Sequence, residues 1–479
     1  MRALPVQPMA GRGRTAAAPV PVPTTAPEGP AAPTWLPGRA HIDGTSLLFV
    51  GYLVLIFLEF SGLPARFPLL KAMKLSTILS YSLLVLVVTR VGISDVIANR
   101  VAKILIGFLV LTWLSVFWAY IHTYAVASVR AIVDYLGLLI ITSYMLDRKS
   151  RMDAFVATFA AVAFTLVGMN FEKLTAGGPR RGEFLAPYFM GDGNDLAWWL
   201  AIALPLIFSL TVGKHSWFYR IIGVVGAAAC LLGVVGTQSR GAFLGIGAAF
   251  LYGWLFVSRK KIYGALMVAA VAVLMVVMAP AGYFERMNTV KDYETDNSAQ
   301  ARIQAWTAGL HMAMDHPMGV GAGNFPSVHG RFYMPDDDHN RVGWGGRRWA
   351  NAHSIYFKVL GEYGFPGLAL LLTAIVTLVI HNTASRRFIR AHPEGAPFTE
   401  YWPAFLNMST LAYAMCGIFL GGFNYPHIFV LTGLCISVQR IIRLEWGGAA
   451  TLPTRAGAAA TLAGPKVRPS VVDAIARRS

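Results

Sequence analysis

The feature of this sequence that most restricts its fold is a series of apolar runs about twenty residues long. A helix of about that length crosses the roughly 30 Å hydrocarbon layer of a membrane, whereas the strands of a β-barrel produce short segments of alternating polarity. Of the 479 residues, 55% are hydrophobic and only 14% are charged. Soluble domains contain roughly 25% charged residues. The sequence therefore predicts an all-α polytopic membrane protein.

The apolar runs predict about twelve transmembrane helices, with a large polar loop between the ninth and the tenth. Their approximate ranges are 45–60, 75–90, 103–124, 127–146, 152–169, 194–213, 217–236, 240–257, 262–280, 353–380, 402–422 and 427–445. The predicted domains are a disordered cytoplasmic tail (1–44), a first group of spans (45–280), an outward-facing loop with an amphipathic helix (281–352), a second group of spans (353–445) and a second disordered cytoplasmic tail (446–479).

The distribution of Lys and Arg predicts the orientation of the spans. Basic residues occupy alternate loops, for example at Arg148, Arg220 and Arg386, and loops of this kind remain in the cytoplasm. Both tails are then cytoplasmic, and the loops 170–193 and 281–352 face outward. The net charge of +17 has the same explanation, because the basic residues are dispersed and no nucleic-acid-binding motif accompanies them. No nucleic-acid partner is predicted.

Two arginines on the outward side are candidates for binding an anion. Arg240 lies at the junction of two spans, where it either meets an anion or snorkels to mark a helix end. Arg302 lies on a helix that Asn297 or Ser298 can cap, one turn before Trp306 and on the same face. From the residues alone, both interpretations of Arg240 stay open.

His353 lies where the polar loop meets the next apolar run. A neutral imidazole at the membrane edge can accept a proton from a hydroxyl near neutral pH. Taken in isolation, a histidine in this place more often has only a structural role, as a helix cap. Glu362 follows on the opposite face of an ideal helix, so the two form no dyad unless the helix breaks, which Gly364 and Pro366 allow.

Further arginines add positive charge to the outward loops. They form two adjacent pairs: Arg180, Arg181, Arg347 and Arg348. The planar guanidinium fork binds two oxygens of a phosphate at once. Together with Arg240 and Arg302, these pairs indicate an anion held at the membrane surface.

Two other polar segments of the large loop are interpreted as structural. The run Asp336–Asp338 with His339 could be imagined as a metal site, but consecutive acids in a loop point in different directions. A solvated turn is preferred there, and no metal is predicted. The glycines at 319, 321 and 323 predict a tight turn, because no Lys-Ser/Thr follows them as a nucleotide-binding loop would require.

Taken together, these segments resemble a known family. Its marks are Gln238-Ser239-Arg240 at a span end, Asn297-Ser298 followed by Arg302 and Trp306, a Pro-x-Gly-x-Gly turn at 317–321, and the run 352–368 that contains His353. In their order and spacing they resemble the O-antigen ligase and O-antigen polymerase family of bacterial inner membranes. The form His-Ser-Ile-Tyr-Phe is also similar to the O-glycosylation ligases associated with exosortase systems. The matching region runs from about residue 191 to residue 370.

This resemblance implies a membrane glycosyltransferase of GT-C-like plan that acts at the periplasmic face in surface polysaccharide or lipopolysaccharide assembly. Its donor would be an undecaprenyl-diphosphate-linked glycan, and its acceptor a hydroxyl of a glycan, of lipid A-core or of a protein. No metal or other cofactor would be needed. By resemblance, Arg240 and Arg302 would hold the diphosphate, and His353 would activate the acceptor hydroxyl. Roles for the two arginine pairs extend beyond the family motifs.

Ligase, polymerase and protein O-oligosaccharyltransferase are not separated by the sequence, since they differ only in the acceptor. A transporter for an anionic lipid is the alternative from another class, and it would need charged residues along a path through the membrane midplane. Few ionisable residues lie inside the spans. One such pair, Arg130 and Asp134, is four residues apart and is expected to neutralise itself. An enzyme is therefore favoured.

Overall fold

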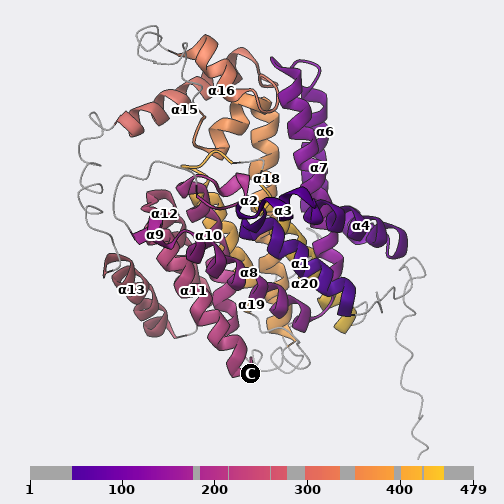
Figure 1. Ribbon diagram of the computed structural model, residues 1–479, viewed down its shortest axis with the longest axis vertical. Helices are drawn as coiled ribbons and strands as arrows, with labels where there is room; N and C mark the ends of the chain where they lie inside the picture. The colour runs from indigo at the N-terminus through magenta and orange to yellow at the C-terminus, as the bar shows by residue number, and fades with distance from the viewer. Residues whose placement is uncertain are drawn as a thin grey trace, which may run out of the picture. The chain divides into compact units, whose positions relative to one another are not determined.

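The computed structural model forms an α-helix at each of the apolar runs predicted above (Figure 1). It describes residues 46–175, 184–213, 215–258, 260–277, 297–334, 351–392, 401–422 and 425–446. The described residues belong to one compact unit, residues 41–479, and no β-strand occurs among them. The two predicted tails lie outside the described residues, as do parts of the large loop, 278–296 and 335–350.

The helices follow one another along the chain with short connections. Up to the first outward loop they are α1 (Ser46–Ser61), α2 (Leu63–Arg66), α3 (Pro68–Ala72), α4 (Leu75–Arg90), α5 (Ser94–Ala98), α6 (Arg100–Ser115), α7 (His122–Met145), α8 (Lys149–Met169) and α9 (Phe171–Thr175). Then come η1 (Tyr188–Met190), α10 (Gly193–Phe208), η2 (Ser209–Thr211), α11 (Trp217–Thr237), α12 (Arg240–Tyr252), η3 (Gly253–Val257) and α13 (Lys261–Val277). The last are α15 (Asn297–Asp315), α16 (Phe325–Val328), η4 (His329–Tyr333), α18 (Ile355–Ala391), α19 (Tyr401–Cys416) and α20 (His427–Trp446).

Eight helical segments among the described residues are long and apolar enough to cross a membrane. They are Pro68–Arg90, His122–Met145, Lys149–Met169, Gly193–Thr211, Trp217–Thr237, Arg240–Val257, Ile355–Ala391 and His427–Leu444. The other predicted spans coincide with α1, α6, α13 and α19, which have 16 or 17 residues each. The all-helical membrane class is thus confirmed, and the count of about twelve spans stays a prediction. The span predicted at 103–124 was too long, because α6 ends at Ser115.

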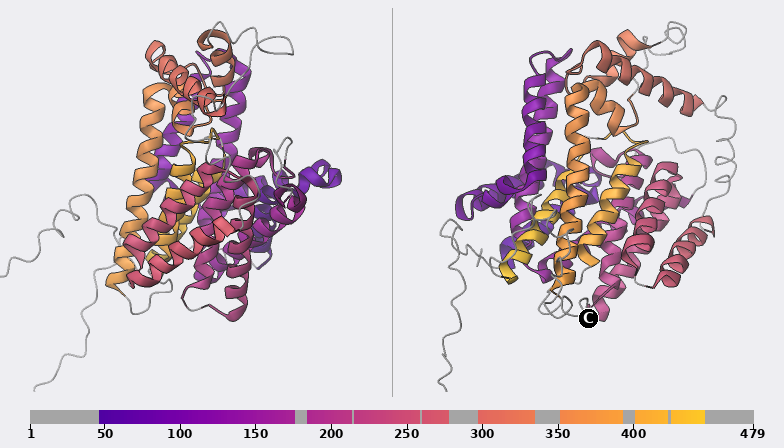
Figure 2. Two further views of the ribbon diagram at one scale, coloured as in Figure 1. Left: turned by 90° about the vertical axis from the view of Figure 1, so that its left-hand side faces the viewer. Right: turned by 180° about the vertical axis from the view of Figure 1, so that it is seen from behind.

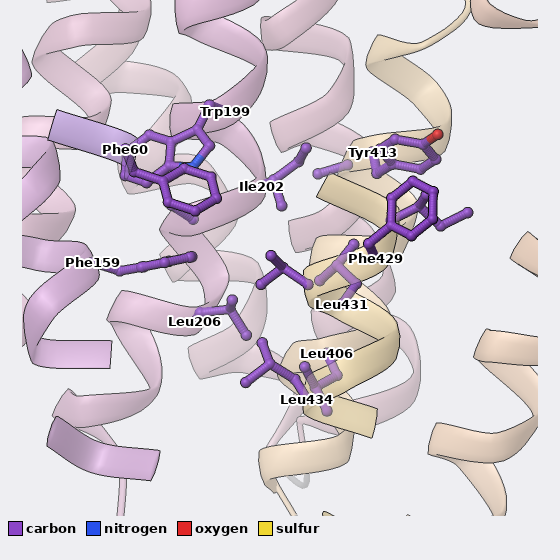
Figure 3. Close-up of a cluster of buried hydrophobic side chains, with 14 of the residues drawn as sticks. Phe60, Phe159, Trp199, Ile202, Leu206, Leu406, Tyr413, Phe429, Leu431 and Leu434 are labelled. Atoms are coloured by element: carbon purple, nitrogen blue, oxygen red, sulfur yellow. The ribbon is translucent and has the colours of Figure 1, made fainter. Parts of the chain in front are cut away.

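Helices α10 and α20 form the most deeply buried part of the bundle. In Gly193–Thr211, 78% of the apolar window is buried, and in His427–Leu444 83% is, against 11% in Pro68–Arg90. Aromatic and branched aliphatic side chains from α1, α8, α10, α19 and α20 fill the space between them (Figure 3). In this cluster the rings of Phe159 and Trp199 lie 5.4 Å apart. The apolar residues that α4 leaves exposed suit contact with lipid.

Ion pairs connect the loops that the Lys/Arg pattern assigns to the cytoplasm. Asp95 accepts hydrogen bonds from Arg440 Nε (2.9 Å) and Arg443 Nη1 (2.8 Å), which joins the connection before α6 to the end of α20. Asp153 contacts both Lys149 and His215, which joins the start of α8 to the connection before α11. These contacts bring the predicted cytoplasmic loops together in pairs.

The ion pair expected between Arg130 and Asp134 is not formed, so this prediction was wrong. Tyr81 of α4 donates its hydroxyl proton to Asp134 Oδ1 over 2.8 Å. A tyrosine from the neighbouring helix reaches the carboxylate where sequence spacing alone favoured the arginine four residues away. The contact ties α4 to α7.

Helix α18 breaks at Gly364, which has φ 63° and ψ −160°. Pro366 contributes to the break, because its ring has no N–H to donate and clashes with the carbonyl of Glu362. The glycine turn after α15 occupies the gap: Val320 N–H donates to Gly361 O (2.9 Å) and Gly321 N–H donates to Glu362 O (3.0 Å). The break that the sequence allowed therefore exists, and it locks the described part of the large loop onto α18. Figure 2 shows α15 and α16 beside the upper part of α18.

Candidate active site

The candidate site is built on the backbone that precedes α18. His353 has φ +46°, a left-handed conformation that is uncommon for a residue with a side chain. The connection after α19 holds this turn in place: Ile355 N–H donates to Gly417 O over 2.8 Å, and a Cβ on Gly421 would lie 3.3 Å from His353 N. Strained backbone of this kind persists only where surrounding structure enforces it. The side chain of His353 is exposed.

Helix α15 brings Arg302 to the same place. Trp306 donates its indole N–H to Ala352 O over 2.9 Å and stacks on Phe357 at 5.2 Å with an interplanar angle of 9°. The opposite side of the helix buries Ala305, Ala308 and Met312. Arg302 lies one turn before Trp306 and is half-buried. The predicted helix, with Arg302 and Trp306 on one face, is thus confirmed.

The electrostatic surroundings of His353 favour the neutral imidazole. Although part of the side chain is open to solvent, the protein atoms around it lower its pKa below the ordinary 6.5, and the positive charge of Arg302 lowers it further. Asp192 acts in the opposite direction, and Lys358 adds a smaller lowering effect. A histidine with a lowered pKa is largely unprotonated at neutral pH, as a general base must be.

Arg240 opens α12 on the far side of the junction. Helix α11 ends at Thr237, Gln238 is left-handed with φ 54°, and Arg240 is the first residue of the next helix, half-buried. A Cβ on its neighbour Gly241 would lie 3.2 Å from Phe419 Cβ, and the Phe419 ring lies 6.3 Å from that of Trp306. Phe419 therefore links the turn that carries Arg240 to the turn that carries His353.

The acidic residues near the junction accept hydrogen bonds from neutral donors. Asp192 caps α10 by accepting from Asn194 N–H (2.6 Å), and Asp195 accepts from the Tyr425 hydroxyl (2.9 Å). Glu362 Oε1 accepts from Phe325 N–H (3.3 Å), which fastens the glycine turn. Glu362 is thus engaged by backbone, in agreement with the prediction that it forms no dyad with His353.

Sequence reasoning missed Asp192, Lys358 and Phe419 as neighbours of His353. Asp192 carries only the signal of a helix cap, and Phe419 lies in an apolar run far along the chain. Lys358 lies five residues beyond the histidine, where α18 is needed to bring it close. None of the three stands in a spacing that marks a site.

Several predicted site residues lie outside the described residues. These are the arginines Arg180, Arg181, Arg347 and Arg348, together with the acidic turn 336–338 and His339. Among the residues that are described, no three His, Cys, Asp or Glu side chains are grouped so as to hold a metal ion.

The described groups can perform acyl- or glycosyl-type transfer chemistry on a hydroxyl. An unprotonated imidazole can take a hydroxyl proton, and arginines can stabilise an anionic leaving group by charge-assisted hydrogen bonds. The chemistry alone does not choose between leaving groups.

Comparison with protein families makes that choice narrower. A family model described as O-Antigen ligase matches residues 225–372, a segment that contains Arg240, Arg302 and His353. No curated protein matches the sequence. The matched segment begins in α11 and ends in α18, so it includes both turns that Phe419 links. Through this segment the chain belongs to the O-antigen ligase family.

Proposed function

We propose that this chain transfers a glycan from undecaprenyl diphosphate to an acceptor hydroxyl at the periplasmic face of a bacterial inner membrane, in the assembly of lipopolysaccharide or another surface polysaccharide. The family match supports a ligase that joins glycans. The observation that carries the residue roles is the meeting of Arg302 and His353, which lie close enough for the guanidinium to lower the imidazole pKa.

In the proposed reaction, the acceptor oxygen attacks the anomeric carbon of the donor sugar. His353 takes the proton of the acceptor hydroxyl as the new C–O bond forms, and the bond from the anomeric carbon to the diphosphate oxygen breaks with both electrons leaving on that oxygen. Arg240 and Arg302 stabilise the charge that develops on the diphosphate. A single displacement of this kind inverts the anomeric configuration, and no metal or nucleotide takes part.

The helical bundle suits such a donor, because a long lipid must stay in the membrane while its diphosphate lies at the surface. Arg240 stands at the N-terminus of α12, where the helix dipole also favours an anion. We assign the arginines Arg180, Arg181, Arg347 and Arg348 to the same anion as a further part of the proposal. The exosortase-associated branch, the periplasmic side and the cytoplasmic tails stay predictions.

The acceptor separates the three related activities. Loss of a polymerase leaves single repeat units, whereas loss of a ligase leaves long chains on the lipid carrier, so the glycan-length profile of a deletion strain distinguishes them. A protein O-oligosaccharyltransferase would leave unmodified protein acceptors in the same strain. We place the ligase first, since that is the description of the matching family.

Substitution of the two central residues tests the proposal. His353→Ala and Arg302→Ala should each reduce transfer by about 10²–10⁴-fold, as expected for loss of a general base or of a charge clamp, while the protein still inserts. His311→Ala is the matched control, because His311 is an exposed histidine on α15. Full transfer by both variants in a purified assay with lipid-linked donor would end the proposal.

A further inference from the structure

A second recess lies at the other end of α15, away from His353. It is a pocket of about 500 Å³, which is large enough for a small organic ligand. Its wall includes four aromatic residues and two polar residues: Trp118, Tyr120, Phe332, Tyr333, Asp315 and His316. Arg302 and Asp315 are thirteen positions apart on one helix, which corresponds to about 20 Å along its axis. The pocket is therefore separate from the candidate active site.

The pocket is held together by contacts between three segments distant in sequence. Tyr120 N–H donates to Val320 O (3.2 Å), and Ile121 N–H donates to Asn324 Oδ1 (2.7 Å), so the α6–α7 connection is fixed to the glycine turn. The rings of Tyr120 and Phe332 meet edge to face at 5.5 Å. Arg331 lies over both rings, 5.8 Å and 5.7 Å from their centroids. These contacts indicate a preformed pocket.

The aromatic surface of the pocket is combined with a polar edge. Trp118 and Phe332 leave 38% and 59% of their surface exposed, which is unusual for such large rings outside a membrane span. Tyr333 donates its hydroxyl proton to Asp315 Oδ2 over 2.7 Å. Burial, and after it the bond to Asp315, raises the pKa of Tyr333 to about 12, so the tyrosine keeps this proton. Asp315 Oδ1 and His316 remain as groups that can bind hydroxyls.

This combination selects among chemical classes of ligand. A lipid tail has no hydroxyl to offer Asp315, and an anionic headgroup would be repelled by its carboxylate. A sugar ring has both an apolar face of C–H groups, which packs on an aromatic ring, and an edge of hydroxyls, which donate to carboxylates. Flat aromatic surface beside a carboxylate therefore fits a pyranose.

We propose that this pocket binds a sugar unit of a glycan chain, remote from the unit that reacts. The inference rests on the proposed function, because it takes the glycan as the substrate. At about 20 Å from Arg302, the pocket cannot hold the sugar attached to the diphosphate, but it can hold a later unit of the same chain or a unit of the acceptor. It then makes binding depend on glycan length.

Binding of free oligosaccharide to the full-length protein in detergent tests this inference without transfer. The probe is the oligosaccharide released by mild acid from the lipid-linked glycan of the host strain, and the readout is saturation transfer from protein aromatic protons to sugar protons. Trp118→Ala should weaken binding about tenfold, and Trp118→Phe should restore it to within about threefold. Trp113→Ala is the matched control, since Trp113 is an exposed tryptophan of α6 that does not line the pocket.

Donors with one and with several repeat units separate the two possible sources of the sugar. If the pocket holds the donor chain, Trp118→Ala raises KM for the long donor and leaves the short donor unchanged. If it holds the acceptor chain, the same substitution raises KM only for the acceptor.

The inference is overturned if the wild-type protein does not bind the probe, or if Trp118→Ala and Phe332→Ala bind it as the wild type does. The proposed function fails by a different result, namely full transfer by His353→Ala and Arg302→Ala. His353→Ala should bind the probe normally, so a loss of catalysis and a loss of the pocket are read independently.

Discussion

The two ends of the helical bundle treat their charges differently. At the end that carries the basic loops, carboxylates pair with cations: Asp95 with Arg440 and Arg443, and Asp153 with Lys149 and His215. At the His353 end, described carboxylates accept from neutral donors instead, as Asp195 does from the Tyr425 hydroxyl and Glu362 from a backbone N–H. Both ends contain arginines, but they are used in different ways.

This difference indicates a structural end and a functional end. Ion pairs within the protein neutralise charges that must lie beside the hydrocarbon layer, and they fasten helices that are distant in sequence. Where carboxylates are held by neutral donors, acidic groups can stay near the arginines without forming the ion pairs seen at the other end. We expect substitutions at one end to change stability and substitutions at the other to change transfer.

The largest effect is expected at Gly364, where the functional end is fastened to the membrane span. In Gly364→Ala the added Cβ would clash with the carbonyl oxygen of Pro317, and alanine rarely adopts φ 63° with ψ −160°. We expect a loss of more than about 3 kcal/mol of stability, and no transfer. Thermal unfolding in detergent measures the first and a transfer assay the second.

Gly247→Ala provides the control for this substitution. Gly247 lies within α12, and a Cβ there meets no atom within 4 Å. This variant should change stability by less than about 1 kcal/mol, in the stabilising direction, because alanine restricts the unfolded chain. Equal effects of the two substitutions would show that the break in α18 is unimportant.

At the structural end, Asp95→Asn should lower stability by about 1–3 kcal/mol, because it removes the counter-charge of the largely buried Arg440. Transfer per folded molecule should not change. The control is Arg148→Ala, which breaks a pair whose arginine is 55% exposed and should cost about 0–1 kcal/mol. A fall in transfer by folded Asp95→Asn would contradict the division between the ends.

At the functional end, Trp306→Phe removes the hydrogen bond to Ala352 O that positions the His353 turn, and it keeps an aromatic ring on Phe357. We expect kcat to fall about tenfold, a loss of roughly 1.4 kcal/mol, with little change in KM for the donor. Trp254→Phe is the control, since Trp254 donates an equivalent bond to Lys261 O (3.0 Å) between α12 and α13. If both variants keep the wild-type kcat, the turn does not depend on Trp306.

The smallest effect concerns the pH dependence of transfer. His353 acts as a base only when unprotonated, so kcat/KM should fall with decreasing pH through its pKa, which burial and then Arg302 hold below 6.5. Lys358→Gln removes a positive charge and should move this acid limb to higher pH. Asp192→Asn removes a negative charge and should move it to lower pH. Shifts in the same direction for both variants would exclude His353 as the titrating group.

Much of this molecule could be predicted from local patterns in its sequence. The apolar runs predicted the helices, because membrane-crossing length and hydropathy are properties of one segment at a time. The spacing of Arg302 and Trp306 predicted their common face, and Gly364 with Pro366 predicted where α18 can break. The pairing of Arg130 with Asp134 failed for the complementary reason: Tyr81, from another helix, competed successfully for the carboxylate.

The sequence by itself determined a helical membrane protein with one histidine and two arginines at span ends. Only the tertiary structure decided that these ends meet. Residues such as Phe419, Gly421 and Asp192 approach the junction from helices distant in the chain, and no periodicity encodes such contacts. The physical reason is that helix formation depends on near neighbours, whereas the left-handed turn at His353 and the field around its imidazole depend on how the helices pack.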